Sequence, residues 1–305
     1  MTNNKTRFSS VNPHWFADLV EQQAPIGLLV ESPTLEDDVV SVNNHYLEIS
    51  RAGNILRGGL FLGGLVIAAL LCWSVPLLLR ISAEPDDEIF FTLVNWILLA
   101  AVMLFSIFLI YLDCRIPRDT PVRFDRETGK VSAYEYPLGP NPLARRVEKI
   151  KTFDWHNVQA ELTRQAGFNG KAYMVRYGLV LVICRPGTNE VVDRVILKSN
   201  DMTVNGLIAL WDYVRSYMSN GLISVPAVTP RSHKISLINS LFIYMPYLNP
   251  TSEGRHFRRR MQPVDLVMVL LTIWFFWIWL PMGICHYIAM KCAPEPHWPA
   301  EMDVY

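Results

Sequence analysis

The chain has 305 residues, and its 28 Lys and Arg balance its 28 Asp and Glu, so it carries no formal net charge at pH 7. Charged residues make up only 18% of the chain, whereas soluble proteins average about 25%. This deficit disfavours a fully soluble protein and indicates a membrane protein. The five cysteines form no C-x-x-C motif and no Cys/His ligand spacing, so we expect neither a disulfide framework nor a bound metal.

The N-terminal part of the chain, residues 1–54, is mostly polar and has no apolar run behind a basic start. This pattern disfavours a signal peptide. We expect a cytoplasmic segment over 1–54, followed by an apolar segment that stays in the membrane as a permanent anchor.

Three runs without Asp, Glu, Lys or Arg are long enough to span a membrane. They occupy 58–79, 89–112 and 266–290. An α-helix rises about 1.5 Å per residue, so a little over twenty residues cross a hydrocarbon core of about 30 Å. The sequence therefore predicts three transmembrane helices, over 55–80, 89–112 and 264–290.

A shorter apolar stretch, 237–247, contains Pro246 and cannot span a membrane. Its aromatic residues Phe242, Tyr244 and Tyr247 are typical of an interfacial segment. We place it in a linker over 221–263.

Every cluster of basic residues beside the predicted spans falls on one side, whereas Arg80 lies at the other end of the first span. They are Arg51, Arg57, Arg115, Arg118, Arg123, Arg255, Arg258, Arg259 and Arg260. Because Lys and Arg near span ends stay in the cytoplasm, we expect a cytoplasmic N-terminus. The acidic turn 84–88 and the tail 291–305 are then expected in the periplasm.

Residues 120–220 change character and predict a soluble, strand-rich α+β domain. Alternating residues on both sides of a glycine turn over 122–136 indicate a β-hairpin. Further strands are expected over 149–162, 172–184 and 190–197. Apolar residues at helical spacing over 202–218 predict a closing helix with a buried Trp211.

The run Phe124-Asp125-Arg126, the run Phe153-Asp154-Trp155 and the closing Trp-containing helix resemble bacterial pleckstrin-homology-like modules that follow a two-helix membrane hairpin. The run from Leu210 to Met218, taken with 122–131, is similar to a proteobacterial membrane family often encoded beside type VI secretion effector genes. This resemblance covers roughly 40–225 and implies kinship and a location in the bacterial inner membrane. It supplies no catalytic residues.

Candidate chemistry is sparse. His156 follows Asp154 by two residues on a predicted strand, and the plainer interpretation is a surface histidine rather than a general base. The chain has no G-x-S-x-G, Walker or H-E-x-x-H motif, so we predict no catalytic residue and no cofactor. No nucleic-acid-binding module is evident either.

Four arginines before the third apolar run form the strongest charge cluster: Arg255, Arg258, Arg259 and Arg260. The plainer interpretation is a determinant of topology. The alternative adds binding of anionic lipid head groups, at about 1 kcal/mol per base near the surface.

Gly59 and Gly63 form a G-x-x-x-G motif in the first span, and small residues let helix backbones approach closely. The plainer interpretation is packing against the second span, and the alternative is a homo-oligomer contact. Asn95 and His286 are the strongly polar residues of the apolar runs, and two such residues do not define a transport path.

These patterns predict a non-catalytic interaction protein that needs the lipid bilayer. The resemblance favours an immunity or accessory factor whose partner is a type VI secretion toxin or a secretion-system protein. Two alternatives remain open: a lipid- or protein-sensing membrane subunit, and a membrane enzyme of unknown reaction.

Overall fold

The computed structural model describes residues 6–22, 35–54, 57–81, 89–136, 148–168, 173–228, 235–259, 261 and 263–302. The predicted loop 138–142, the acidic turn 84–88 and Arg260 lie outside the described residues. The chain forms two compact units. The β-domain comprises described residues within Met1–Ile55, Asp119–His233 and Pro296–Tyr305, and the membrane unit those within Leu56–Arg118 and Lys234–Glu295.

The first sheet of the β-domain is an antiparallel meander of five strands in sequence order. Its strands are β2 (Val39–Val42), β3 (Tyr46–Ile49), β4 (Val122–Asp125), β5 (Lys130–Glu135) and β6 (Lys149–Asp154). Strand β3 pairs with β4, with Tyr46 opposite Asp125 and Ile49 opposite Val122. The predicted hairpin over 122–136 is confirmed as β4 and β5.

The second sheet is antiparallel and has the strand order β1-β7-β8-β9. Its strands are β1 (Trp15–Asp18), β7 (Val158–Phe168), β8 (Tyr173–Cys184) and β9 (Val191–Asp201). Gly178 interrupts the β8–β9 register, and a Cβ there would lie 2.7 Å from Thr163 Oγ1. Strands β1, β2 and β3 come from the N-terminal segment, so the domain extends beyond the predicted limits of 120–220.

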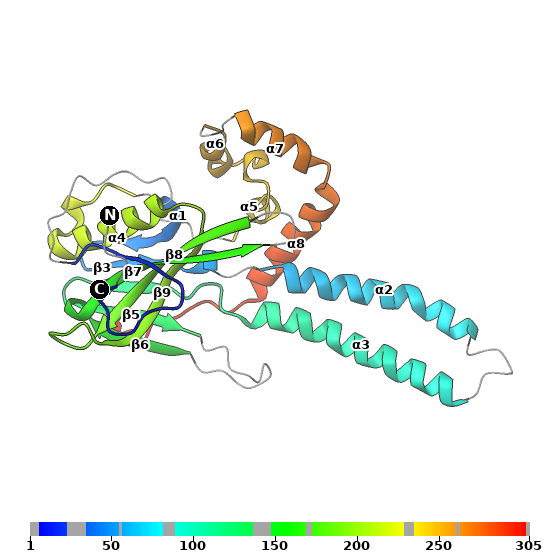
Figure 1. Cartoon of the computed structure of the whole chain (residues 1–305). Coiled ribbons are helices and arrows are strands. Elements are labelled where there is room, and N and C mark those ends of the chain that lie inside the picture. The colour runs from blue at the N-terminus through cyan, green and yellow to red at the C-terminus, as the bar shows by residue number, and fades with distance from the viewer. Residues whose placement is uncertain are drawn as a thin grey trace. The chain divides into compact units, whose positions relative to one another are not determined.

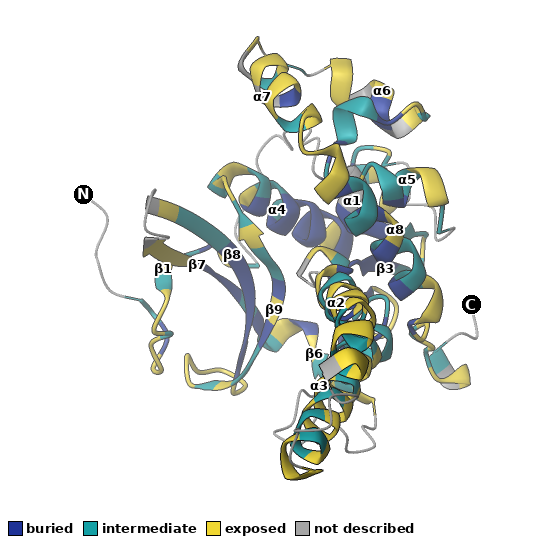
Figure 2. Cartoon of the chain, turned by 90° about the vertical axis from the view of Figure 1, so that its right-hand side faces the viewer, coloured by how far each residue is buried: buried dark blue, intermediate teal, exposed yellow. Residues whose placement is uncertain are grey.

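Helix α4 (Val204–Asn220) closes the β-domain and is buried along most of its length (Figure 2). The predicted burial of Trp211 is confirmed, since its side chain is fully buried together with Leu207, Leu210 and Val214. The Trp211 ring lies 5.7 Å from that of Trp155, and its indole N–H donates to the Val20 carbonyl at 2.9 Å. A short helix, α1 (Leu35–Asp38), precedes β2.

The membrane unit is built around α2 (Gly59–Ile81) and α3 (Ile89–Arg115), which run side by side as a helical hairpin (Figure 1). Both helices are long and apolar enough to cross a membrane. Large apolar side chains along them point outward, among them Leu70, Trp73, Leu77, Ile89 and Leu104. This is the expected surface of helices that face lipid.

The third apolar run is divided, which differs from the single helix predicted over 264–290. It consists of α7 (Pro263–Ile273) and α8 (Phe276–Cys292), bent by 90° at the break between them. The linker carries the short helices α5 (Leu237–Leu241) and α6 (Ser252–Arg259). Phe242, Tyr244 and Tyr247 pack around Met245, Val269 and Trp279.

Candidate functional site

The base of the helical hairpin is held by a buried carboxylate. Asp113, in the last turn of α3, accepts hydrogen bonds at Oδ2 from the backbone N–H groups of Gly58 and Phe61, both at 2.9 Å. These amides belong to the first turn of α2, where backbone N–H groups lack partners within the helix and the helix dipole favours a negative charge. Asp113 therefore caps α2 from the neighbouring helix.

Arg57 makes the reciprocal contact at the end of α3. Its guanidinium is buried and donates to the carbonyls of Asp113 at 3.4 Å and Ile116 at 2.8 Å, and to that of Pro117. Carbonyls after a helix C-terminus lack partners within the helix, so Arg57 satisfies them and complements the helix dipole. Arg57 thus has a packing role in addition to the topological one that the sequence suggested.

The close approach of α2 and α3 occurs at Gly64. A Cβ there would lie 2.7 Å from Ile110 Cγ1 and 2.8 Å from the Ser106 carbonyl, and Ser106 Oγ donates to the Gly64 carbonyl at 2.6 Å. At Gly59 and Gly63, an added Cβ would meet no described atom within 4 Å. The structure therefore places the packing contact one residue beyond the predicted motif.

Three of the four arginines of the predicted cluster lie on α6. The side chains of Arg255, Arg258 and Arg259 are exposed. Arg258 also donates to the carbonyls of Tyr247 at 2.9 Å and Asn249 at 2.6 Å. Arg258 thus anchors α6 to the linker, while Arg255 and Arg259 present their charges outward.

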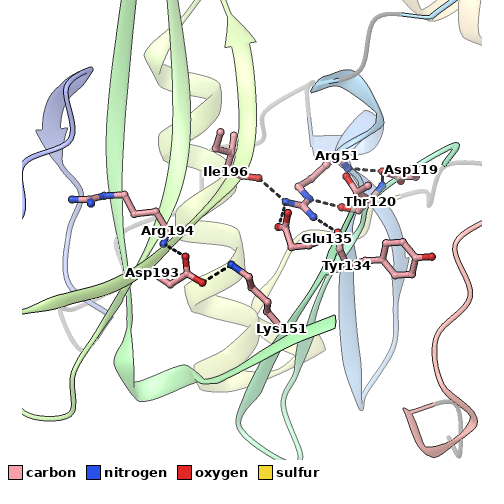
Figure 3. Close-up of polar contacts among 9 residues, drawn as sticks. All are labelled: Arg51, Asp119, Thr120, Tyr134, Glu135, Lys151, Asp193, Arg194 and Ile196. Atoms are coloured by element: carbon pink, nitrogen blue, oxygen red, sulfur yellow. Dashed lines mark hydrogen bonds and ion pairs between the residues drawn. The ribbon is translucent and has the colours of Figure 1, made fainter. Parts of the chain in front are cut away.

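In the β-domain, Arg51 connects the two sheets (Figure 3). Its guanidinium is buried and donates to the Glu135 carboxylate at 2.9 Å, to the Ile196 carbonyl at 3.2 Å, and to two further carbonyls, those of Thr120 and Tyr134. Strand β5 of the first sheet and β9 of the second are thereby bonded to one side chain.

A second bond between the sheets joins their edge strands. Lys151 Nζ of β6 lies 2.6 Å from Asp193 Oδ2 of β9 (Figure 3). Because both side chains are partly exposed, this ion pair contributes little free energy of unfolding, about 0–1 kcal/mol. Its main effect is to fix which edges meet.

A polar cavity of about 450 Å³ opens beside Arg51. Its lining residues are Asp38, Ser50, Arg51, Gly53, Arg176, Lys198, Ser199, Asn200, Asp201 and Met202. Lys198 Nζ is paired with Asp38 at 2.5 Å and lies 3.8 Å from Asp201. No pattern in the sequence predicted this cavity, because its residues come from separate elements that meet only in the folded domain.

The C-terminal tail, residues 296–302, lies in the β-domain. It contacts Arg123 of β4 and Glu48 of β3, and we name these two residues, together with Tyr46 of β3 beside Arg123, the tail cradle. The Arg123 guanidinium lies between two rings, 4.3 Å from the centroid of Tyr46 and 4.6 Å from that of Trp298. It also contacts Glu48 Oε2 at 3.1 Å and donates to the Met302 carbonyl at 2.8 Å.

The tail cradle is shielded from solvent. Arg123 and Glu48 are both buried. Burial raises the pKa of Glu48 above its ordinary value, and the charges and hydrogen bonds of Arg123 oppose this rise. This position of the tail differs from the periplasmic location predicted for 291–305, since the tail packs on strands expected in the cytoplasm.

The other predicted candidates lie on separate elements. His156 is exposed in a short 3-10 turn, Trp155–Asn157, between β6 and β7. Asn95 is half-buried on α3, and His286 is half-buried on α8. Within the described part of the chain, no group of three or more His, Cys, Asp or Glu side chains is arranged to hold a metal ion.

Comparison with known proteins identifies one family. No curated protein and no solved structure matches the chain. A family model described as a family of unknown function, DUF6708, matches residues 99–304. The match runs from the middle of α3 through β4–β9, the divided apolar run and the tail. Because it covers more than half of the sequence, the chain belongs to this family.

Proposed function

We propose that this protein is a non-catalytic interaction protein of the bacterial inner membrane, with its β-domain in the cytoplasm. The observation that carries the proposal is the outward-facing apolar surface of α2 and α3, together with the exposed apolar side chains of α7. Such a surface is stable only in lipid or against an apolar partner. The cytoplasmic assignment rests on the basic residues that flank the spans, including Arg255 and Arg259.

The more specific proposal is immunity or accessory function toward a type VI secretion toxin. It is supported by the sequence resemblance through Leu210–Met218 and by the large share of the chain devoted to membrane contact. A toxin that acts in the inner membrane would meet the lipid-facing sides of α2 and α3 directly.

We also propose that the β-domain is a pleckstrin-homology-like module. Two antiparallel sheets followed by a closing helix support this assignment, with β3–β6 and β7–β9 as the two strand sets and α4 as the helix. On this assignment the membrane hairpin is an insertion between β3 and β4.

The test is co-expression with the product of the adjacent gene while growth is followed. The full-length protein should restore growth to cells that the adjacent product poisons. A matched variant keeps the β-domain and helices α5–α8 but replaces α2 and α3 with an unrelated two-span hairpin of the same length. Loss of rescue in this variant locates the partner in the membrane, whereas retained rescue locates it on the β-domain. Absence of toxicity from the neighbour contradicts the immunity proposal.

The cavity beside Arg51 favours a second candidate function, a sensing subunit. The cavity holds the cations Arg51, Arg176 and Lys198 against the anions Asp38 and Asp201, so a small anion is the best-matched ligand. Inorganic phosphate and glycerol 3-phosphate are suitable probes. A rise in the thermal unfolding midpoint with either probe, lost in Arg176→Ala, supports sensing, and no shift with either contradicts it.

A further inference from the structure

We infer that the divided apolar segment, α7 with α8, enters the bilayer and leaves it on the same side, so that the C-terminal tail stays with the β-domain. The chain would then cross the membrane twice, through α2 and α3. The segment would contact the hydrocarbon of one leaflet without crossing it. This inference concerns topology and does not depend on the immunity function.

The first observation is the position of the tail. Trp298 stacks on Arg123, which is buried between β3 and β4 side chains, and its ring lies 6.0 Å from that of Tyr134 in an edge arrangement. Tyr134 belongs to β5, so the tail contacts three neighbouring strands of one sheet. Residues in such contact must lie on the same side of a membrane.

The second observation lies within the membrane unit and is independent of the tail. Arg118, three residues after the end of α3, donates from Nε to the Met290 carbonyl at 2.8 Å and forms an ion pair with Glu295 at 3.3 Å. Its backbone N–H donates to the Pro294 carbonyl at 2.9 Å. The C-terminal end of α8 therefore lies at the end of α3 that returns to the β-domain.

Packing along α8 agrees with this placement. Cys285 and Ala289 of α8 are buried against Phe61, in the first turn of α2, and Ile110 lies against the same cluster. Phe61 and Ile110 mark the ends of α2 and α3 nearest in sequence to the β-domain. A single crossing from α7 through α8 would place the C-terminal end of α8 beside Ile81 and Ile89 instead.

Helix length gives the third observation. Helix α7 has 11 residues and α8 has 17. At about 1.5 Å per residue they measure about 16 Å and 25 Å, against a hydrocarbon core of about 30 Å. Neither helix crosses alone, and the 90° bend prevents them from adding their lengths along one direction.

Connectivity completes the argument. The chain leaves the β-domain after His233 and re-enters it at Pro296. A segment that starts and ends on one side of a membrane crosses it an even number of times. Two crossings would require two helices that each span the hydrocarbon core, and both α7 and α8 are too short for this. The segment therefore does not cross the membrane.

The bend between the helices defines the surface that meets lipid. Trp274, Phe275, Phe276 and Trp277 are exposed by 79%, 51%, 57% and 62%. These four consecutive aromatic side chains are exposed on the described membrane unit. Their apolar rings are suited to the hydrocarbon of one leaflet, and the indole N–H groups of the two tryptophans are suited to its polar boundary. We name these four residues the aromatic tip.

The experiment is sided labelling of single cysteines in the full-length protein, after the five native cysteines are replaced by Ala. A membrane-impermeant maleimide is applied to right-side-out and to inverted vesicles. Thr128→Cys reports the β-domain, Ala300→Cys the tail, Ser82→Cys the α2–α3 connection and Trp274→Cys the aromatic tip. Thr128, Trp274 and Ala300 are all exposed.

We expect Ala300→Cys and Thr128→Cys to be labelled from one side and Ser82→Cys from the other. Trp274→Cys should be labelled from neither side until detergent is added. Labelling of Ala300→Cys from the Ser82 side would overturn the inference in favour of a broken single span. Labelling of Trp274→Cys in intact vesicles would also overturn it, because the aromatic tip would then be outside the bilayer.

Discussion

Buried charges in this protein connect elements that are distant in the chain. Arg51 joins two sheets, Arg57 and Asp113 cap one another's helices, and Arg123 holds the tail. A buried charge is costly unless hydrogen bonds replace its hydration, and each of these side chains has such bonds. Removing one partner of such a buried group should therefore lower the free energy of unfolding more than removing a surface charge does.

Arg51→Met keeps an unbranched apolar stem but removes the guanidinium donors. The Glu135 carboxylate and the carbonyls around it then lose their partner, which should lower the free energy of unfolding by about 3 kcal/mol. Arg185→Met is the matched control, because Arg185 forms an exposed ion pair with Glu190 at 2.8 Å. The control should cost about 0–1 kcal/mol in chemical denaturation of the detergent-solubilised chain. Equal losses in the two variants would contradict the bridging role of Arg51.

Glu48 gives the tail cradle a pH dependence. Burial raises its pKa above the ordinary value of 4.5, so the folded protein binds this proton more tightly than the unfolded chain does. The resulting stabilisation is fully present below the ordinary pKa and is lost as the pH rises through the raised value. Relative to Glu48→Gln, the wild type should lose free energy of unfolding between acidic and neutral pH. A relative gain over that range would show that the Arg123 ion pair outweighs burial.

At the scale of elements, local patterns predicted the hairpin β4–β5, the strands β8 and β9 and helix α4, because each has its own periodicity. The single strand predicted over 149–162 is instead two strands, β6 and β7, which are separated by the 3-10 turn Trp155–Asn157 and pair in different sheets. Strands β2 and β3 were missed for a physical reason. Each has four residues, and β3 pairs with β4 only after the whole α2–α3 hairpin. Such non-local pairing leaves no signal in a short window of sequence.

The sequence also did not predict which face of α2 packs against α3. Gly59, Gly63 and Gly64 lie close together in a helix that is apolar on every side, so composition does not single out one of them. Helix α3 approaches α2 at Gly64, where the Ser106 carbonyl and Ile110 leave no room for a side chain.

Gly64→Val and Gly63→Val test this choice as a matched pair with the same change in helix propensity. Overpacking at Gly64 should cost about 1–3 kcal/mol, because a side chain there must displace backbone atoms of α3. Gly63→Val should be nearly neutral, since its Cβ enters open space. The thermal unfolding midpoint in detergent is the measurement. A lower midpoint for Gly63→Val than for Gly64→Val would contradict the observed packing.

At the scale of the whole molecule, the β-domain is assembled from three stretches of chain separated by membrane segments. The sequence predicted helices that could span a membrane and a strand-rich domain. It placed the tail apart from that domain, whereas residues 296–302 pack on it. That assignment followed from the basic residues that flank the spans and from counting the third apolar run as a full crossing, whereas this run is divided by a 90° bend. The contacts of Trp298 with Arg123 and Tyr134 place the tail on the β-domain, and composition alone does not reveal these contacts.

The central claim is that the C-terminal tail, residues 296–302, shares one side of the membrane with the β-domain, the cytoplasmic side on the proposed orientation. A dual reporter fused after Tyr305 of the full-length chain tests it directly. It combines a phosphatase active only in the periplasm with a fluorescent protein that matures only in the cytoplasm. The same reporter inserted between α2 and α3 is the control for the opposite side. We predict fluorescence without phosphatase activity at Tyr305 and the reverse at the control position. Phosphatase activity after Tyr305 would contradict the account.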